Sequence, residues 1–245
     1  NQQRLIEEGA IGGLVDLLRS KSKDVQENAA GALRNLSMKG DAAVRIVEEG
    51  GLGFLIELLR SVEDPIVEQA VTCIRNLSII DENKLKISNL GGLSPLLLLL
   101  SSINSRIQEQ AAVVIRNISL IEENETAIIQ QGGLPALIEL LHSNSEMLQE
   151  QSLVTLRNIS VGRSSSSSND RKIMESGALP AIVALLRSPS NSIQEQAAGA
   201  VRNISVVFFR AHLPNCLSSP PVCSATLQST KRTSSALFPK LLFLT

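Results

Sequence analysis

The sequence predicts an all-α solenoid of about five three-helix repeats, because several columns of residues recur with one period. The signature Arg-Asn-Leu/Ile-Ser occurs five times. Its arginines are Arg34, Arg75, Arg116, Arg157 and Arg202, separated by steps of 41, 41, 41 and 45 residues. A glutamate stands seven residues before each, at Glu27, Glu68, Glu109, Glu150 and Glu195. A glycine keeps the same register at Gly9, Gly50, Gly91, Gly132 and Gly177. A period of roughly 40 residues indicates stacked units that bury their apolar faces against one another.

The third unit shows how each repeat is expected to fold. A short first helix is predicted over residues 84–89, with Asn83 as its cap and Gly91 as its end. The second helix should start near Pro95, since proline suits a first turn, and continue to residue 100. After a serine-rich break, a third helix is predicted from about Arg106 to Ser119. Its apolar residues have helical spacing and are Ile107, Ala111, Val114, Ile115 and Ile118.

The same pattern divides the rest of the chain. The units are expected at about 1–41, 42–82, 83–123, 124–168 and 169–209. The one longer step is explained by a serine-rich insertion at 162–170, which should form a loop. Residues 210–245 lose the register and are rich in Ser, Thr and Pro, so we expect a mostly disordered tail. Alternatively, the apolar end of the tail folds back to cover the last unit. The chain begins with Asn1 rather than Met, which indicates a fragment.

Composition argues against several kinds of partner. The net charge is −1, which carries no overall bias toward nucleic acid or an acidic membrane. The absence of Trp and Tyr removes the usual stacking platforms for single-stranded bases. The longest purely apolar run, residues 96–100, is far shorter than the ~20 residues that span a bilayer. We therefore expect no nucleic-acid partner and no membrane insertion.

No catalytic or cofactor-binding motif stands out. The two histidines, His142 and His212, lack a second ligand at metal spacing, and no phosphate-binding glycine loop or nucleophile elbow occurs. Cys73 is expected to be a small core residue. Together with Cys216 and Cys223 it indicates reduced thiols of an intracellular, cytoplasmic or nuclear protein. The prediction is a protein that is not an enzyme and has no metal, cofactor or small-molecule substrate.

The repeated residues resemble a known family. Three helices in about 41 residues, the Gly-Gly-Leu-x-Pro opening of the second helix and Gln-Glu-Gln-Ala-Ala before Arg-Asn-Ile-Ser are similar to armadillo repeats. This resemblance implies a right-handed superhelix whose third helices line a concave groove. It also implies that the asparagine of the signature binds the backbone of an extended peptide. The corresponding residues here are Asn35, Asn76, Asn117, Asn158 and Asn203.

Helical spacing supports a second row of amides beside the first. Seven residues are close to two turns, so the amide before each asparagine shares its face. These residues are Asn28, Gln69, Gln110, Gln151 and Gln196. An amide offers both a donor and an acceptor, as an extended backbone requires, and each unit should span about three peptide residues. Alternatively, the asparagines cap helix ends or bond across units without touching a ligand. The glutamate and arginine columns are predicted to form a structural ion-pair ladder.

Differences between this sequence and known armadillo proteins limit the kinds of peptide that we expect it to bind. Importin-alpha-like proteins carry Trp one turn before the asparagine, where this chain has Gly31, Thr72, Val113, Val154 and Gly199. A simple basic peptide is therefore not expected. The ladder face also lacks an obvious Lys/Arg column, unlike beta-catenin with its acidic peptides. An apolar fringe, at Met38, Ile79, Leu120, Val161 and Val206, suggests a partner with apolar side chains. The predicted function is a protein-interaction scaffold. The alternative is the substrate-recruiting region of a larger ubiquitin ligase with a U-box or F-box, resembling plant U-box/armadillo proteins.

Overall fold

The computed structural model describes residues 2–160 and 167–212, and every regular element in these ranges is a helix. The first helices of the units are α1 (Gln2–Glu7), α4 (Gly40–Glu48), α7 (Asp81–Asn89), α10 (Glu122–Gln130) and α13 (Ser167–Glu175). The second are α2 (Ala10–Leu17), α5 (Gly51–Leu58), α8 (Leu93–Leu99), α11 (Gly133–Leu141) and α14 (Ala178–Leu185). The third are α3 (Lys23–Leu36), α6 (Asp64–Leu77), α9 (Ser105–Ile118), α12 (Glu146–Ser160) and α15 (Asn191–His212).

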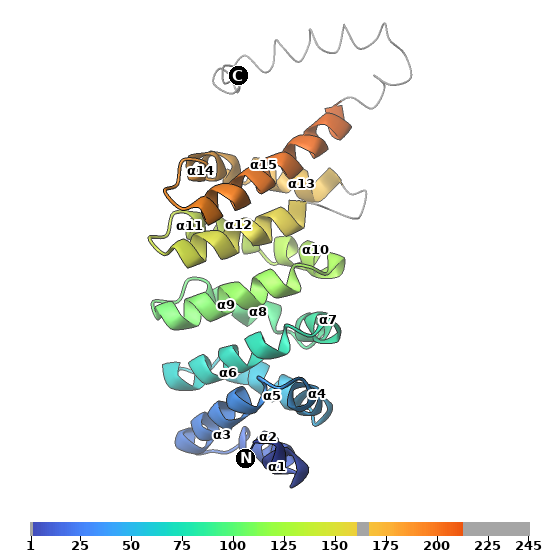
Figure 1. Cartoon of the computed structure of the whole chain (residues 1–245), viewed down its shortest axis with the longest axis vertical. Helices are drawn as coiled ribbons and strands as arrows, with labels where there is room; N and C mark the ends of the chain where they lie inside the picture. Colours follow the sequence, from blue (N-terminus) through green and yellow to red (C-terminus); the bar gives the residue numbers. More distant parts are fainter. Residues whose placement is uncertain (1, 161–166, 213–245) are drawn as a thin grey trace, which may run out of the picture.

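The units stack in chain order, so that the third helices lie side by side along the length of the molecule (Figure 1). Each third helix packs on the next one and on the second helix of its own unit. One continuous apolar core runs through the stack, from Ile6 to Ile204. The predicted all-α solenoid is confirmed. Its stability comes from burial shared between neighbouring units, because a single unit has no closed core of its own.

A glycine turn joins the first helix to the second in every unit. Gly9, Gly50, Gly91, Gly132 and Gly177 all have φ between 76° and 83°. Only glycine adopts this left-handed conformation without strain. In three units a second glycine follows, and a Cβ on Gly92 would lie 2.7 Å from the carbonyl oxygen of Ile87. The glycine column therefore marks a tight turn that brings the first and second helices of each unit together.

Asn83 does not cap the start of its own helix, as the sequence suggested. Helix α7 begins two residues earlier, at Asp81, and the Asn83 side chain is buried. Its Nδ2 donates to the carbonyl oxygen of Leu77, 3.1 Å away at the end of α6. Asn124 makes the same bond to Ile118, at 3.0 Å. These asparagines satisfy the free carbonyls at the end of the preceding third helix.

Other helix boundaries follow local chemistry. Helix α9 begins after Asn104, whose Oδ1 accepts from the backbone N–H of Arg106 at 3.1 Å. Helix α8 starts at Leu93 rather than near Pro95, because proline is tolerated throughout a first turn. Of the predicted loop at 162–170, residues 162–166 lie outside the described residues, and residues 167–170 belong to α13, which begins at Ser167.

Helix α15 continues to His212, beyond the point where the other third helices end. Residues 210–212, the first three of the predicted tail, belong to this helix. The remainder, 213–245, lies outside the described residues. Within the described ranges, no helix is both long enough and apolar enough to cross a membrane.

Candidate functional site

The candidate site is the surface formed by α3, α6, α9, α12 and α15, which we call the ladder face. Its two amide rows are the asparagine row (Asn35, Asn76, Asn117, Asn158 and Asn203) and the second row (Asn28, Gln69, Gln110, Gln151 and Gln196). Each third helix contributes one member to each row, and the two members are about 10 Å apart along the helix. The stack therefore repeats the same pair of amides once per unit.

The asparagine row bonds across units. Nδ2 of Asn117 donates to Oγ of Ser78 at 2.8 Å, and Nδ2 of Asn158 donates to Oγ of Ser119 at 3.0 Å. Asn76 bonds Ser37 in the same way, at 2.9 Å. Asn117 is only 7% exposed. The alternative interpretation, bonding between units, thus describes the amide N–H groups of Asn76, Asn117, Asn158 and Asn203.

The carbonyl halves of the asparagines are used differently. Oδ1 of Asn35 accepts from Nε and Nη2 of Arg34, at 3.2 and 2.9 Å. Oδ1 of Asn117 accepts from the same two atoms of Arg116, at 3.3 and 2.8 Å. The stack does not use these oxygens, since both bonds stay within one unit. These oxygens therefore take no part in the bonds between units.

The predicted ladder of Glu–Arg ion pairs is wrong. The ion pairs between described residues join Lys84 to Asp81, Arg106 to Glu68, and Arg171 to Glu175, and none of them links the two columns. Three of the column arginines, Arg34, Arg116 and Arg157, bond side-chain amide oxygens instead. Nη1 of Arg157 donates to Oε1 of Gln196 in the next unit, at 2.7 Å. The arginine side chains are long and stand near the ends of the third helices, so they reach the amide rows. The ladder face therefore has an arginine column, which the sequence alone did not place there.

The second row contains acceptors without a donor. Within the described part of the chain, Oε1 of Gln69, Gln110 and Gln151 is buried and has no hydrogen-bond partner. Asn28 is exposed and donates to the backbone of its own helix, at Asp24. A buried polar atom without a partner costs about 1–3 kcal/mol and requires an explanation. Oε1 of Gln196 is the equivalent atom in the last unit, and it accepts from Arg157 of the preceding unit. The arginine of the preceding unit can therefore supply the missing donor.

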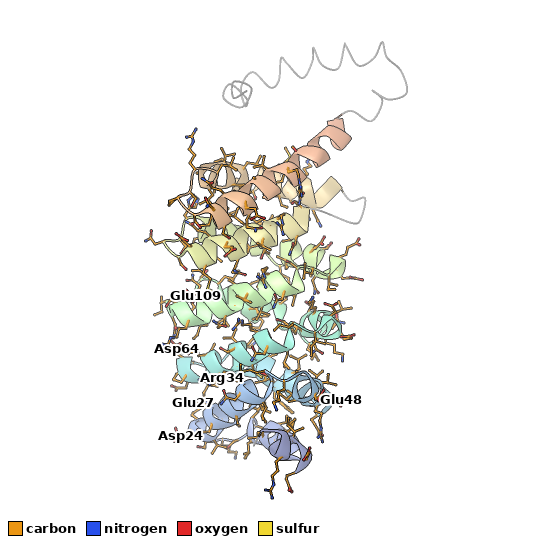
Figure 2. The ribbon with its side chains drawn as sticks, viewed as in Figure 1. Asp24, Glu27, Arg34, Glu48, Asp64 and Glu109 are labelled. Atoms are coloured by element: carbon orange, nitrogen blue, oxygen red, sulfur yellow. The ribbon has the colours of Figure 1, made fainter. Side chains whose placement is uncertain are left out.

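Four acidic and three exposed apolar side chains lie at opposite ends of the third helices. Figure 2 shows Asp24, Glu27, Asp64 and Glu109 along one edge, where the third helices begin. Three exposed apolar side chains lie just past the opposite ends of these helices: Met38, Ile79 and Leu120, at 78%, 69% and 51% exposure. The apolar fringe is confirmed for these three residues. The side chains of Val161 and Val206 lie outside the described residues.

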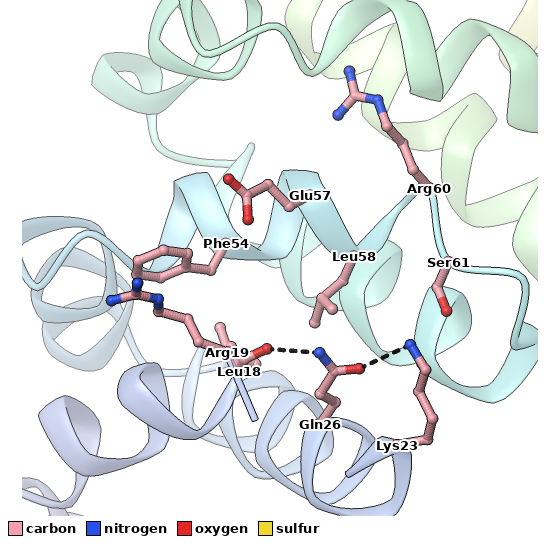
Figure 3. A pocket seen from close by; sticks show the side chains of 9 residues that line it. All are labelled: Leu18, Arg19, Lys23, Gln26, Phe54, Glu57, Leu58, Arg60 and Ser61. Atoms are coloured by element: carbon pink, nitrogen blue, oxygen red, sulfur yellow. Dashed lines mark hydrogen bonds between the residues drawn. The ribbon is translucent and has the colours of Figure 1, made fainter. Parts of the chain in front are cut away.

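A cavity of about 380 Å³ lies between the first two units, and Lys23 and Gln26 at the start of α3 are among the residues that line it (Figure 3). Arg19 covers the Phe54 ring, with Cζ 5.3 Å from the ring centroid. Gln26 donates to the carbonyl oxygen of Leu18 at 3.1 Å and accepts from Lys23 at 3.4 Å. These side chains satisfy one another at an exposed junction, and nothing in their arrangement indicates a reaction centre.

No group of three or more His, Cys, Asp or Glu residues in the described ranges is placed to hold a metal ion. Cys73 is fully buried, and this burial raises the pKa of its thiol to about 12. Such a thiol is a poor nucleophile, so Cys73 is the core residue that the sequence predicts.

Comparisons with known proteins agree with this architecture. A family model described as armadillo/beta-catenin-like repeat matches residues 1–38, 42–79, 81–120, 122–161 and 166–206. No curated protein matches the chain. Among solved structures, an engineered protein is 31% identical with a TM-score of 0.78, over 83% of this chain and 50% of its own. This chain therefore spans half the length of that protein.

Two other solved structures match over most of their length. Computationally designed armadillo repeat proteins for modular peptide recognition are 30% identical, with a TM-score of 0.78, over 82% of this chain and 85% of theirs. A designed armadillo repeat protein in complex with the peptide (KR)4 is 30% identical, with a TM-score of 0.76, over 83% of this chain and 85% of its own.

Proposed function

The chain belongs to the armadillo/beta-catenin-like repeat family, and from this membership we propose that its ladder face binds an extended peptide segment of a partner protein. The asparagine row and the second row are the proposed contacts. The fold is typical of binding scaffolds without catalytic activity. We propose that the partner is a protein rather than a nucleic acid, a membrane or a small molecule. The cytoplasmic or nuclear location stays a prediction.

The observation that carries this proposal is that the third helix of each unit has an amide at the same position, all along a continuous stack. An extended peptide backbone presents N–H and C=O groups at regular intervals, so equally spaced amides can bond it without reading its side chains. Oδ1 of Asn117 accepts only from Arg116 of its own unit. A peptide N–H can replace that donor and leave the inter-unit bonds intact.

The designed relatives support the general role and not the particular ligand. One group is named for modular peptide recognition, and one structure holds the peptide (KR)4. The positions one turn before the asparagines here, such as Val113 and Gly199, carry no aromatic ring for a lysine stem. No feature of the described residues favours the alternative of a substrate-recruiting region in a ubiquitin ligase, which would use the same face beside a U-box or F-box.

The experiment separates binding from stacking by removing either end of the same inter-unit bonds. Peptides are first selected by display against the chain. Asn76 and Asn158 are then replaced together by Ala, and the matched control replaces their partners Ser37 and Ser119 by Ala. Both variants lose the Asn–Ser bonds between units, so both should melt at a lower temperature. In the serine variant Asn76 keeps its second bond, from Nδ2 to the carbonyl oxygen of Arg34 at 3.2 Å. Only the asparagine variant should lose affinity, by about tenfold for two hydrogen bonds of ~0.5–1.5 kcal/mol each.

Fluorescence anisotropy of a labelled selected peptide measures the affinity, and circular dichroism measures the melting temperature. Equal Kd values for the two variants would contradict the proposal, because the asparagines would then act only in stacking.

A further inference from the structure

We propose that a cavity between α8 and α11 is a second docking site, which takes one large apolar side chain of a partner protein that stands beside a lysine or arginine. The cavity has a volume of about 360 Å³. Every residue that lines it belongs to these two second helices or to the turns next to them, so none comes from a third helix. In Figure 1, α8 and α11 lie behind the third helices. The inference therefore stands independently of the proposed function at the ladder face.

The first argument is that the third unit departs from the repeat on its outer surface. Units one, two and four carry an acid and a base or histidine at the end of the second helix: Asp16 with Arg19, Glu57 with Arg60, and Glu139 with His142. The third unit has Leu98 and Ser101 in those places, and Leu98 is 75% exposed. Leu90, just before α8, is 53% exposed and stands where units one and two have Glu8 and Glu49. The outer surface of this unit has therefore exchanged charge for apolar side chains.

The second argument is the apolar lining of the cavity beside Leu98. Leu97 and Leu98 line it from α8, and Pro135 and Ala136 line it from α11. The cavity between the first two units differs, because charged side chains such as Arg19, Lys23 and Glu57 line that one. Single exposed apolar residues are common on protein surfaces. An exposed leucine next to an apolar cavity is different, since the cavity can remove a partner's side chain from water.

The third argument is the charge next to this apolar surface. Glu139 lines the same cavity and is exposed, and no ion pair between described residues includes it. Glu57, one unit before Leu98, is also exposed and outside those ion pairs. Arg60 does not neutralise it, since Nη2 of Arg60 donates to the carbonyl oxygen of Gly91 at 3.4 Å. A lysine or arginine beside the partner's apolar side chain would therefore meet an unpaired carboxylate.

The small extent of the apolar surface indicates a short segment of another protein rather than a second copy of this chain. Ser94, Ser101 and Gln131 also line the cavity and are polar or exposed, so they bound the apolar surface around Leu98. Stable interfaces between folded proteins bury about 1,200–2,000 Å² in total, far more than one cavity of this size supplies. Binding at such a site depends on one anchoring side chain that fills the cavity.

The test isolates peptides that need Leu98. A library of random peptides displayed on phage is selected for binding to the full chain, and peptides that also bind the Leu98→Glu variant are removed. This variant gives the third unit the residue that units two and four carry as Glu57 and Glu139, so the fold should be kept. Circular dichroism checks that it is. The remaining peptides should share a Leu, Ile, Met, Phe or Trp close to a Lys or Arg.

Variants assign the binding to the cavity, with the Kd of a labelled selected peptide measured by fluorescence anisotropy. Leu98→Glu should raise the Kd by about tenfold or more, as the loss of a central apolar contact does, and the smaller change Leu98→Ala should raise it as well. Glu139→Gln should raise the Kd by about two- to fivefold, in the range of an exposed ion pair. The matched control Met38→Glu puts the same residue at an exposed apolar position near the ladder face, and it should leave the Kd unchanged.

The outcomes distinguish this site from the ladder face. The selected peptides should bind the variant with both Asn76→Ala and Asn158→Ala as tightly as the parent chain, and a loss of affinity there would overturn the proposal by placing them on the ladder face. Failure to retain any peptide after the subtraction would overturn it while leaving the proposed function untouched. An unchanged Kd in Glu139→Gln would overturn the basic neighbour.

Two further measurements test the other possible occupants of the cavity. Self-association of the full chain that Leu98→Glu abolishes, seen by sedimentation velocity, would overturn the proposal in favour of a second copy. Tighter peptide binding after Leu241→Ser and Phe243→Ser would overturn it in favour of the chain's own C-terminal residues. The expected result is a monomer and an unchanged Kd.

Discussion

Nδ2 of Asn117 lies 2.8 Å from Oγ of Ser78, although the two residues are 39 positions apart. Ser78 donates in turn to the carbonyl oxygen of Arg75, at 2.7 Å, near the end of α6. This relay ties the end of one third helix to the side of the next, and it recurs at Asn76 and Asn158. The signature Arg-Asn-Leu/Ile-Ser is therefore a stacking device in its own right, beside any part that it has in binding.

The relay predicts unequal effects of the same substitution in different units. Asn117→Ala should lower the free energy of unfolding by about 1–2 kcal/mol, because it leaves buried hydrogen-bonding groups without a partner. Asn35→Ala should change it by less than about 0.5 kcal/mol, since Asn35 is exposed and has no described unit before it. Urea unfolding followed by circular dichroism gives both values. Equal losses would show that Asn117 is not held by the neighbouring unit.

The second row predicts opposite signs for one substitution at two equivalent positions. Gln151→Met should leave the free energy of unfolding unchanged or raise it, because the buried Oε1 of Gln151 has no partner to lose. Gln196→Met should lower it by about 1–2 kcal/mol, since it removes the acceptor of Arg157. The comparison uses chemical denaturation of both variants. A large destabilisation by Gln151→Met would mean that an unseen donor, such as a water molecule, satisfies this amide.

The turn glycines predict a contrast between two glycines of different conformation. Gly91 has φ of 76°, so Gly91→Ala should cost about 1 kcal/mol of stability. Gly53 lies within α5 with open space where a Cβ would stand, so Gly53→Ala should stabilise the chain by roughly 0.5–1 kcal/mol. Thermal melts of the two variants should shift in opposite directions. A rise in melting temperature for Gly91→Ala would refute the assigned turn.

The buried thiol predicts a loss of stability in alkali. Burial raises the pKa of Cys73 from 9.0 to about 12 in the folded chain. Between these two values the unfolded chain releases the proton and the folded chain keeps it, so stability falls as pH rises. The expected loss between pH 8 and pH 10 is on the order of 1 kcal/mol. Comparing Cys73→Ala with the parent at both pH values isolates this contribution, and the variant should show a smaller pH dependence.

Native Cys73 should also resist alkylation. With Cys216 and Cys223 replaced by serine, iodoacetamide should label the chain only after denaturant is added, because the folded thiol is both neutral and inaccessible. Mass spectrometry of the native and unfolded samples measures the labelling. Rapid modification of the native chain would contradict the buried position.

The helix pattern was predictable because its causes are local. The positive φ of Gly50 and Gly132 belongs to a turn that glycine favours in any context. Apolar spacing in residues 106–119 was enough to place α9, which ends one residue earlier, at Ile118. Asn83 was misassigned because its partner, the carbonyl oxygen of Leu77, belongs to the preceding unit. The sequence shows a good capping residue without showing which helix end it meets.

The sequence by itself determined the repeat, its register, the three helices of each unit and the two amide rows, because period and helical spacing are properties of one chain segment at a time. Tertiary structure alone decided which groups those side chains meet. Arg116 and Arg157 occupy the same place in the signature, yet one bonds its own asparagine and the other bonds the next unit's glutamine. A guanidinium on a long flexible side chain has several acceptors within reach, and only the packing of neighbouring helices selects one of them.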